Sequence, residues 1–273
     1  MSLVENWQGY LVSQTDSSTQ IFSPWKLNGA PVFGYDSDYT TLAISLLRRL
    51  ASEEKTLVVS EVDNQVSKQI LFAATNTVEG ENGLTISCGK DASVIAFTGE
   101  ISLVEVPISN MVEIDSEIYH GINHAWQDES NEKNISQGAY VSGQQYDESL
   151  ESRLSLIAQE HDMLIWPRRQ MDDQGNKISE NNVRIKPEGK ITSWTKLSAA
   201  GAPSEFAIRA PILGGISTVM VQTTDGPNGV FLLADDQDLT PQIGDSVEIV
   251  VRRLYAQEGL MRYGAKAIIN NRS

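Results

Sequence analysis

The feature that most constrains the fold is a succession of short apolar segments beyond Gly189. Six segments rich in β-branched and aromatic residues follow one another there, each separated from the next by Gly, Asn, Asp or Pro: ITSWTKL, EFAIRAP, ISTVMVQT, GVFLLADD, SVEIVVRRLY and LMRYGAKAI. Short strands punctuated by turn residues in this way are typical of a small barrel or sandwich. We therefore predict that residues 189–273 form a β domain.

The first half alternates helical and strand signals. Residues 39–51 are apolar with helical spacing and follow Asp38, a typical N-cap residue, which predicts a buried helix. Residues 56–60 fit a short core strand, and residues 69–74 fit either a strand or a helix. Residues 84–106 contain two apolar runs around a Gly-Lys-Asp turn, which predicts a pair of strands. This pattern favours an α/β arrangement over an all-β one.

A polar, irregular stretch separates the two halves. Residues 113–143 include the run QDESNEKN and predict a linker. Residues 146–160 return to helical periodicity, and residues 172–182 are polar and turn-rich. A chain of 273 residues, at about 150 residues per domain, has room for one large or two ordinary domains.

Charge and cysteine content exclude several classes of protein. The 21 basic and 36 acidic residues give a net charge of −15, which repels a polyphosphate backbone and disfavours nonspecific nucleic-acid binding. A single cysteine, Cys88, excludes an intrachain disulfide framework and multi-cysteine metal sites. The N-terminus has no basic and apolar leader, and the apolar runs are shorter than the ~18 residues of a membrane span. We therefore expect a cytoplasmic protein with neither a membrane nor a nucleic acid as partner.

Three motifs in the C-terminal part carry a resemblance to a known family. They are GKITSWT at 189–195, IGDSVE at 243–248 and VRRLY at 251–255. The first resembles the G-x-[IV]-x-[ST]-[WYF]-T strand of the acyl-CoA-associated zinc-ribbon/OB-fold proteins, and the second resembles their [IV]-G-x-x-V-x strand. The resemblance implies an OB-fold β-barrel over residues 189–273. It also implies a coenzyme A thioester as ligand and no other cofactor.

The residues before the barrel resemble the zinc ribbon of the same family. LIWPRR at 164–169 is similar to its aromatic-Pro-Pro-Arg knuckle. The positions where the family has two C-x-x-C pairs hold Ala158, His161, Met171 and Gln174 here. Only His161 could ligate zinc, and a structural zinc needs about four nitrogen or sulfur ligands. The resemblance therefore implies a degenerate, metal-free ribbon that persists through the packing of its tryptophan.

The first half resembles part of the thiolase-like proteins related to hydroxymethylglutaryl-CoA synthase. GYDSDYTTLA at 34–43 is similar to their G-x-D-E-D-x-x-T-x-A helix start, and residues 84–97 are similar to a strand, turn and strand near the end of their thiolase domain. A full condensing domain needs far more chain, and Cys88 does not lie in a nucleophile elbow. The resemblance therefore implies a shortened scaffold without its catalytic apparatus.

Together the resemblances imply an α+β chain of three parts. They are a truncated thiolase-like α/β domain with linker at 1–143, a helix and degenerate zinc-ribbon segment at 144–188, and an OB-fold domain at 189–273. They also imply a thiolase-like or ketosynthase-like protein as partner, and association into an oligomer.

Cys88 and two histidines are the side chains that could support catalysis. A thiolate beside a glycine could attack an acyl thioester, but burial in a strand raises the pKa of a thiol, which favours a structural role. His120 and His124 would share a face of a helix, where they could bind a metal or transfer a proton. The intervening Gly-Ile-Asn is a poor helix interior, which favours a surface role instead.

Arginine pairs and aromatic residues are the candidates for ligand binding. Arginine pairs suit the phosphates of coenzyme A, and an aromatic side chain on an open barrel face, Tyr255 included, could stack its adenine. The alternative is local ion pairing, and strand alternation sends neighbouring arginines to opposite faces. The predicted ligand-binding residues are Arg168, Arg169, Trp194, Phe206, Arg252 and Arg253.

Three functions follow from these features. The first is a non-catalytic accessory subunit that docks on a thiolase- or ketosynthase-like condensing or acyl-transferring enzyme and completes its acyl-CoA channel. The second is an acyltransferase that uses Cys88 or a histidine on acyl-CoA substrates. The third is an OB-fold nucleic-acid binder, which the charge of −15 opposes. No phosphate-binding glycine loop and no G-x-S-x-G elbow supports nucleotide or hydrolase chemistry.

Overall fold

The computed structural model describes residues 4–51, 56–133, 142–160, 162–178, 181–237 and 239–270. The chain divides into two compact units. Unit 1 is Met1–His124 with Val251–Arg253, and unit 2 is Ala125–Val250 with Leu254–Ser273. Each unit has its own sheets and core. The three-part division predicted from the sequence, at residues 143 and 188, stays a prediction.

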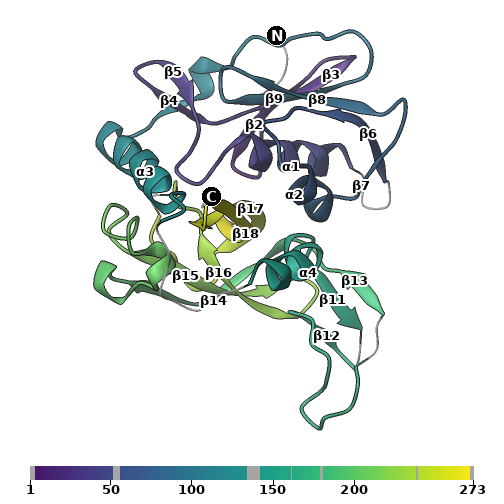
Figure 1. The fold of residues 1–273 in the computed structure, drawn as a ribbon, viewed down its shortest axis with the longest axis vertical. Coiled ribbons are helices and arrows are strands. Elements are labelled where there is room, and N and C mark those ends of the chain that lie inside the picture. The colour runs from purple at the N-terminus through teal and green to yellow at the C-terminus, as the bar shows by residue number, and fades with distance from the viewer. Residues whose placement is uncertain are drawn as a thin grey trace. The chain divides into compact units, whose positions relative to one another are not determined.

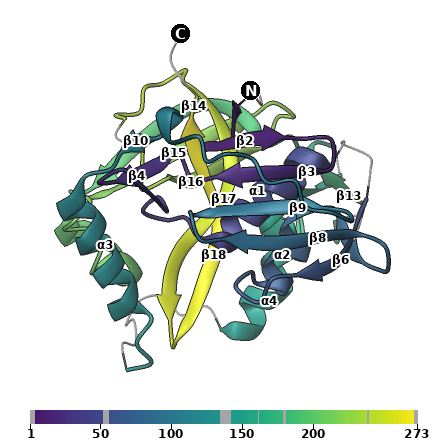
Figure 2. The ribbon, with the colours of Figure 1, turned by 90° about the horizontal axis from the view of Figure 1, so that it is seen from above.

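Unit 1 is built on a seven-stranded mixed sheet. The strand order is β1 (Val4–Trp7), β2 (Tyr10–Gln14), β3 (Ser18–Phe22), β9 (Ser93–Phe97), β8 (Leu84–Gly89), β6 (Leu57–Val62) and β7 (Thr77–Glu79). Pairing is antiparallel from β1 to β8 and parallel among β8, β6 and β7. Helices α1 (Tyr39–Leu50) and α2 (Lys68–Ala74) lie against one face of this sheet (Figure 1). Figure 2 shows the central strands of the sheet side by side.

The strongest signals of the first half are confirmed in unit 1. Helix α1 begins at the predicted place, because Asp38 and Thr41 form a capping box: the Asp38 carboxylate accepts from the Thr41 backbone N–H at 2.9 Å, and the Thr41 hydroxyl oxygen accepts from the Asp38 N–H at 2.9 Å. The apolar face of α1 is fully buried. Strand β6 and the antiparallel pair of β8 and β9 lie where strands were predicted. The ambiguous segment at 69–74 is helical.

The strands before residue 33 are absent from the prediction. Two of them, β4 (Trp25–Leu27) and β5 (Ala30–Val32), form a separate three-stranded sheet with β10 (Val112–Glu113), which follows the short helix η1 (Ile108–Asn110). The β4–β5 turn is Asn28-Gly29, with φ values of 52° and 79°. Asn-Gly is the favoured dipeptide for a two-residue hairpin turn. The sequence therefore contained the signal for this turn. Strands of three residues, however, are too short to show the alternation of apolar and polar side chains that predicts a strand.

The prediction of a linker over 113–143 is wrong for its first part. Residues Ser116–Glu129 form helix α3. Ile122 and Trp126 are buried and lie one turn apart on the same face, so burial of this face outweighs the unfavourable Gly121 that precedes Ile122. The rest of the predicted linker, residues 134–141, lies outside the described residues.

Unit 2 contains a closed five-stranded barrel. Around the barrel the order is β14 (Glu188–Leu197), β15 (Ile216–Thr223), β16 (Asn228–Leu233), β18 (Leu260–Ile269) and β17 (Ser246–Gln257). Strands β16 and β18 are parallel, and β17 pairs with β14 to close the barrel. Alternate side chains of the strands fill the interior, among them Ile191, Val219, Phe231 and Ile249. The arrangement is compatible with an OB-fold.

One predicted barrel strand is wrong. The segment EFAIRAP, residues 205–211, contributes to the short helix η3 (Ser204–Phe206) and to the turns that follow it, after another short helix η2 (Ala199–Gly201). Phe206 and Ala210 are buried in a small cluster with Ile216. The segment is therefore apolar because it packs in a loop and not because it pairs in a sheet.

Unit 2 also holds helix α4 (Gly143–Leu154) and a small sheet. The helix predicted over 146–160 is confirmed up to Leu154, where it ends and the chain turns into β11 (Ile157–Glu160). The sheet order is β12 (Leu164–Ile165), β11 and β13 (Asn182–Arg184). In the described parts of the chain, no helix has the length and apolar character needed to cross a membrane.

Candidate functional site

Cys88 lies at the end of β8 with its side chain half-buried. Its backbone N–H donates to the Asp63 carboxylate at 3.2 Å, and the Tyr39 hydroxyl donates to the carbonyl of the next residue, Gly89, at 2.7 Å. Burial, and then the negative charge of Asp63, raise the pKa of the Cys88 thiol to about 12. The thiol is therefore protonated at neutral pH and is a poor nucleophile.

The histidines lie on a helix after all. His120 and His124 are both exposed on helix α3. The expectation that the intervening Gly-Ile-Asn disfavours a helix here is therefore wrong. The expected surface position agrees with the structure. The His120 ring contacts the Tyr119 ring edge-on at 5.6 Å. Within the described ranges, no group of three or more His, Cys, Asp or Glu side chains could hold a metal ion. His161, the one predicted ribbon ligand, lies outside them.

Arg252 and Arg253 make structural contacts within unit 1. The Arg252 side chain is 1% exposed, lies 3.6 Å from the Asp36 carboxylate and donates to the Gln8 carbonyl at 2.8 Å. Its guanidinium also sits over the Tyr10 ring, 4.3 Å from the centroid. Arg253 donates from its side chain to a backbone carbonyl at 3.3 Å. Ligand binding by this pair stays a prediction, and the observed contacts hold the core together.

Unit 2 contains a buried charge cluster that was not predicted from the sequence. Arg209 donates from Nε to Glu129 at 2.7 Å and from Nη1 to Asp235 at 2.9 Å, and Lys266 pairs with the second Asp235 oxygen at 2.7 Å. The Arg209 guanidinium also lies 3.8 Å from the centroid of the Trp126 ring. Two cations thus meet two carboxylates in the interior. The available signal was a single charge inside each of two apolar segments, FAIRAP and YGAKAII.

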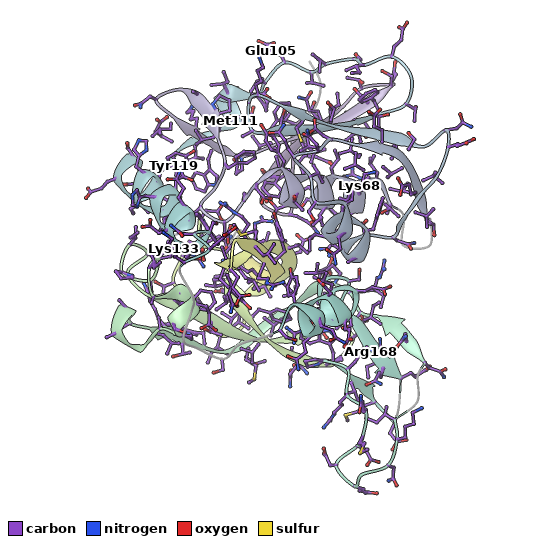
Figure 3. The ribbon with its side chains drawn as sticks, in the orientation of Figure 1. Lys68, Glu105, Met111, Tyr119, Lys133 and Arg168 are labelled. Atoms are coloured by element: carbon purple, nitrogen blue, oxygen red, sulfur yellow. The ribbon has the colours of Figure 1, made fainter. Side chains whose placement is uncertain are left out.

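The other predicted ligand residues lie in different parts of unit 2. Arg168 and Arg169 are exposed just after β12, where Figure 3 labels Arg168, and Arg169 pairs with Asp173 at 2.8 Å. Trp194 is 39% exposed on β14. Phe206 is buried, with its ring edge-on to Tyr255 at 6.1 Å between centroids. The first three are accessible to a ligand, whereas Phe206 is a packing residue.

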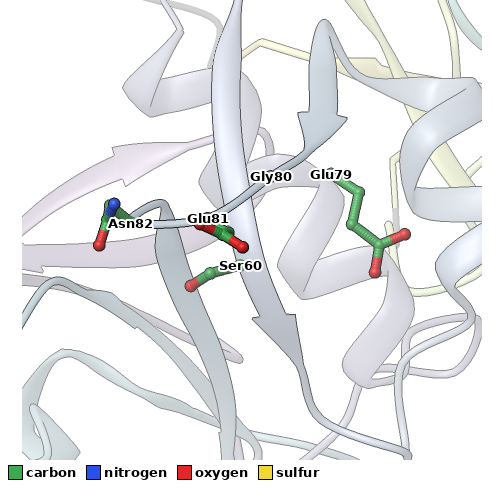
Figure 4. A pocket seen from close by; sticks show the side chains of 5 residues that line it. All are labelled: Ser60, Glu79, Gly80, Glu81 and Asn82. Atoms are coloured by element: carbon green, nitrogen blue, oxygen red, sulfur yellow. The ribbon is translucent and has the colours of Figure 1, made fainter.

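A pocket of about 550 Å³ in unit 1 has an acidic lining (Figure 4). It is formed by Ser60, Glu79, Gly80, Glu81 and Asn82. Glu79 is paired with Lys68 at 3.3 Å, and both partners are largely exposed. Two carboxylates at the wall repel an anionic ligand such as a nucleotide phosphate. This pocket therefore does not suit a coenzyme A thioester.

A second pocket, of about 460 Å³, lies in unit 2 between α4 and the barrel. Helix α4 contributes Tyr146, Leu150 and Arg153, which the helical period places on one face. Trp166 and Phe231 form the facing wall, with their rings stacked at 5.3 Å and 19° between planes. The pocket is thus aromatic and apolar with one cationic side chain, and it is of the size that small ligands occupy.

Comparisons with known proteins do not assign this chain to a family. No protein-family model matches it, and no curated protein sequence matches it. Among solved structures, a similar chain comes from an "Ltp2-ChsH2(DUF35) aldolase"; it is 16% identical with a TM-score of 0.33, over 44% of this chain and 89% of that chain. A likeness of this extent carries no argument about function.

Proposed function

We propose that this protein is a non-catalytic accessory subunit of an acyl-CoA-processing enzyme. In this function it docks on a thiolase-like or ketosynthase-like partner and completes the partner's acyl-CoA channel. Unit 1 would be the truncated thiolase-like scaffold, since the motif at 34–43 leads into α1 and the motif at 84–97 spans β8 and β9. The sheet of β11, β12 and β13 would be the degenerate ribbon. The proposed location of the protein is the cytoplasm.

The observation that carries the proposal is the state of Cys88. The competing function is acyl transfer by this chain through Cys88 or a histidine, and its Cys88 route needs a thiolate at neutral pH. A pKa of about 12 leaves the Cys88 thiol in its unreactive form, and the nearest charge that acts on it, the Asp63 carboxylate, opposes ionisation. An accessory role needs no such group.

Docking is supported by apolar side chains on the outside of the barrel. Met220 on β15 and Val230 on β16 are directly paired and are 41% and 62% exposed. Exposed apolar side chains on adjacent strands are a common feature of protein interfaces.

Co-expression tests the proposal. The full chain is produced with a thiolase- or ketosynthase-like protein encoded beside it, and the complex is examined by size-exclusion chromatography and by acyl-CoA turnover. We expect a stable complex whose turnover needs this chain and is unchanged by Cys88→Ala. Met220→Ser should weaken association, whereas replacement of an exposed residue elsewhere, Asp16→Asn, should not. Loss of turnover in Cys88→Ala, or a chain that stays alone, would contradict the proposal.

A further inference from the structure

The pocket of unit 2 has walls built from helix α4, the Trp166-Pro167 segment and three barrel strands. One wall is the α4 face that carries Tyr146, Ser149 and Arg153, and the others come from the Trp166-Pro167 segment and from the barrel strands β16, β17 and β18. The Tyr146 hydroxyl is fixed, because it donates to the Tyr263 carbonyl at 3.2 Å and accepts from the Tyr263 N–H at 2.8 Å. The wall is therefore held in place before any ligand arrives.

The aromatic side of the pocket depends on a glycine. A Cβ atom at Gly229 would lie 2.5 Å from the Phe231 ring and 2.7 Å from the Trp166 ring. Trp166 is also anchored by its indole N–H, which donates to the Ser152 carbonyl at 3.4 Å. The missing side chain at 229 thus lets the two rings stack and present a flat apolar surface to the pocket.

The charged groups of the pocket are arranged for an anion at one end. Arg153 is exposed in the last turn of α4 and lines the pocket. Burial raises the pKa of Tyr255, another lining residue, while the charges of Arg262 and Arg153 lower it and that of Glu205 raises it. Arg168 follows the lining residue Pro167 in the chain and is exposed. Among the described residues that line this pocket there is no carboxylate, in contrast to the pocket of unit 1.

We infer that the unit 2 pocket binds the acyl group of an acyl thioester, with its chain against Trp166 and Phe231 and an anionic group of the ligand facing Arg153. An apolar body with a negative end matches apolar walls with a single cation. The inference rests on the proposed function, since that function supplies the thioester as the class of ligand.

Calorimetric titration of the full chain tests the inference. Octanoyl-CoA is the probe, and coenzyme A and octanoate are titrated separately. Ser149→Phe fills the pocket from α4 and should abolish binding of octanoyl-CoA. Arg153→Gln removes the cation and should weaken it about tenfold. The matched controls are Gln144→Phe, on α4 outside the pocket, and Arg184→Gln, an exposed arginine on β13; both should bind as the wild type does.

The outcomes separate the pocket from the proposed function. If Ser149→Phe does not fold, Val230→Trp, at a lining position that is 62% exposed, takes its place. Unchanged affinity in the filling variant, no binding of octanoyl-CoA, or equal binding of coenzyme A alone overturns the inference. Octanoate binding as tightly as octanoyl-CoA overturns it too, because the ligand would then be a free acid. A partner complex that forms while octanoyl-CoA does not bind rejects the pocket alone, whereas a chain that binds octanoyl-CoA but associates with no partner rejects the proposed function alone.

Discussion

Arg252 in unit 1 and Arg209 in unit 2 are the most deeply buried arginines of the described residues, and they are neutralised differently. In unit 1, Arg252 has one carboxylate at 3.6 Å, that of Asp36, and the face of a tyrosine ring. In unit 2, Arg209 has two carboxylates at 2.7 and 2.9 Å and a tryptophan ring, and Lys266 shares one of these carboxylates. Both side chains are 1% exposed. Burial of a charge is therefore tolerated in both cores, but the denser network is in unit 2.

The two arginines also show how neighbouring charges in a sequence bias the prediction of ligand-binding residues. Arg252 stands beside another arginine and was selected as a ligand-binding candidate for that reason. Arg209 stands alone and was not selected, although it is the more heavily paired of the two. A local density of charge says little about accessibility, because accessibility depends on which face of the strand or loop meets the core.

Removal of the Arg209 side-chain charge should have the largest effect. Arg209→Met leaves the Glu129 carboxylate, which is 4% exposed, without its arginine. We expect a loss of about 3–5 kcal/mol in the free energy of unfolding, the usual cost of breaking a buried pair. The measurement is urea denaturation of the full chain followed by tryptophan fluorescence.

A second replacement separates charge from packing. Arg209→Met combined with Glu129→Leu removes the carboxylate that Arg209→Met leaves without its arginine, while Asp235 keeps its pair with Lys266, so the double variant should recover part of the lost stability. If the double variant is less stable than Arg209→Met by the full cost of a second core substitution, the electrostatic account of this cluster is wrong.

Arg252→Met should cost less, about 3 kcal/mol, at the lower end of the same range. The Asp36 carboxylate loses its contact with Arg252, and the longer separation of 3.6 Å implies a weaker attraction. Arg253→Met is the matched control from the next position. That side chain is only half-buried and donates to a carbonyl, so its loss should cost about 1 kcal/mol. Equal losses at the two positions in urea denaturation would remove the distinction between a buried ion pair and a half-buried hydrogen bond.

Much of the fold could be predicted because it is periodic. Helix α1 has a capping residue and an apolar face, and the barrel strands alternate between turns, so a single segment contains the whole signal. Helix α3 and the segment around Arg209 were missed because their burial is decided by tertiary packing and not by local pattern.

The candidate site was harder to predict than the fold. The unit 2 pocket joins Tyr146, Trp166 and Phe231, which lie in separate segments of the chain. The sequence pointed to Trp166 through a motif, but nothing in it showed that a helix residue twenty positions earlier and a barrel strand later would form the facing walls. Pockets made by distant segments depend on register and packing, which composition and spacing do not contain.

We expect the smallest effect on the free energy of unfolding from changes around Cys88, where the neighbouring charge acts on the ionisation of a thiol. The contrast with the buried arginines lies in the sign of that neighbouring charge. Here the neighbouring carboxylate, Asp63, has the same sign as the ionised side chain, so it favours the neutral form. With a pKa of about 12, the rate of alkylation by iodoacetamide should rise about tenfold per pH unit from pH 7 to 10 without levelling off. Asp63→Asn removes the like charge, lowers the pKa and should speed alkylation at pH 8, whereas the remote Asp16→Asn should not. A plateau below pH 10 in the wild type would contradict the raised pKa of Cys88, and a plateau already at about pH 7 would mean a thiolate at neutral pH, so that the acyltransferase function would replace the accessory one.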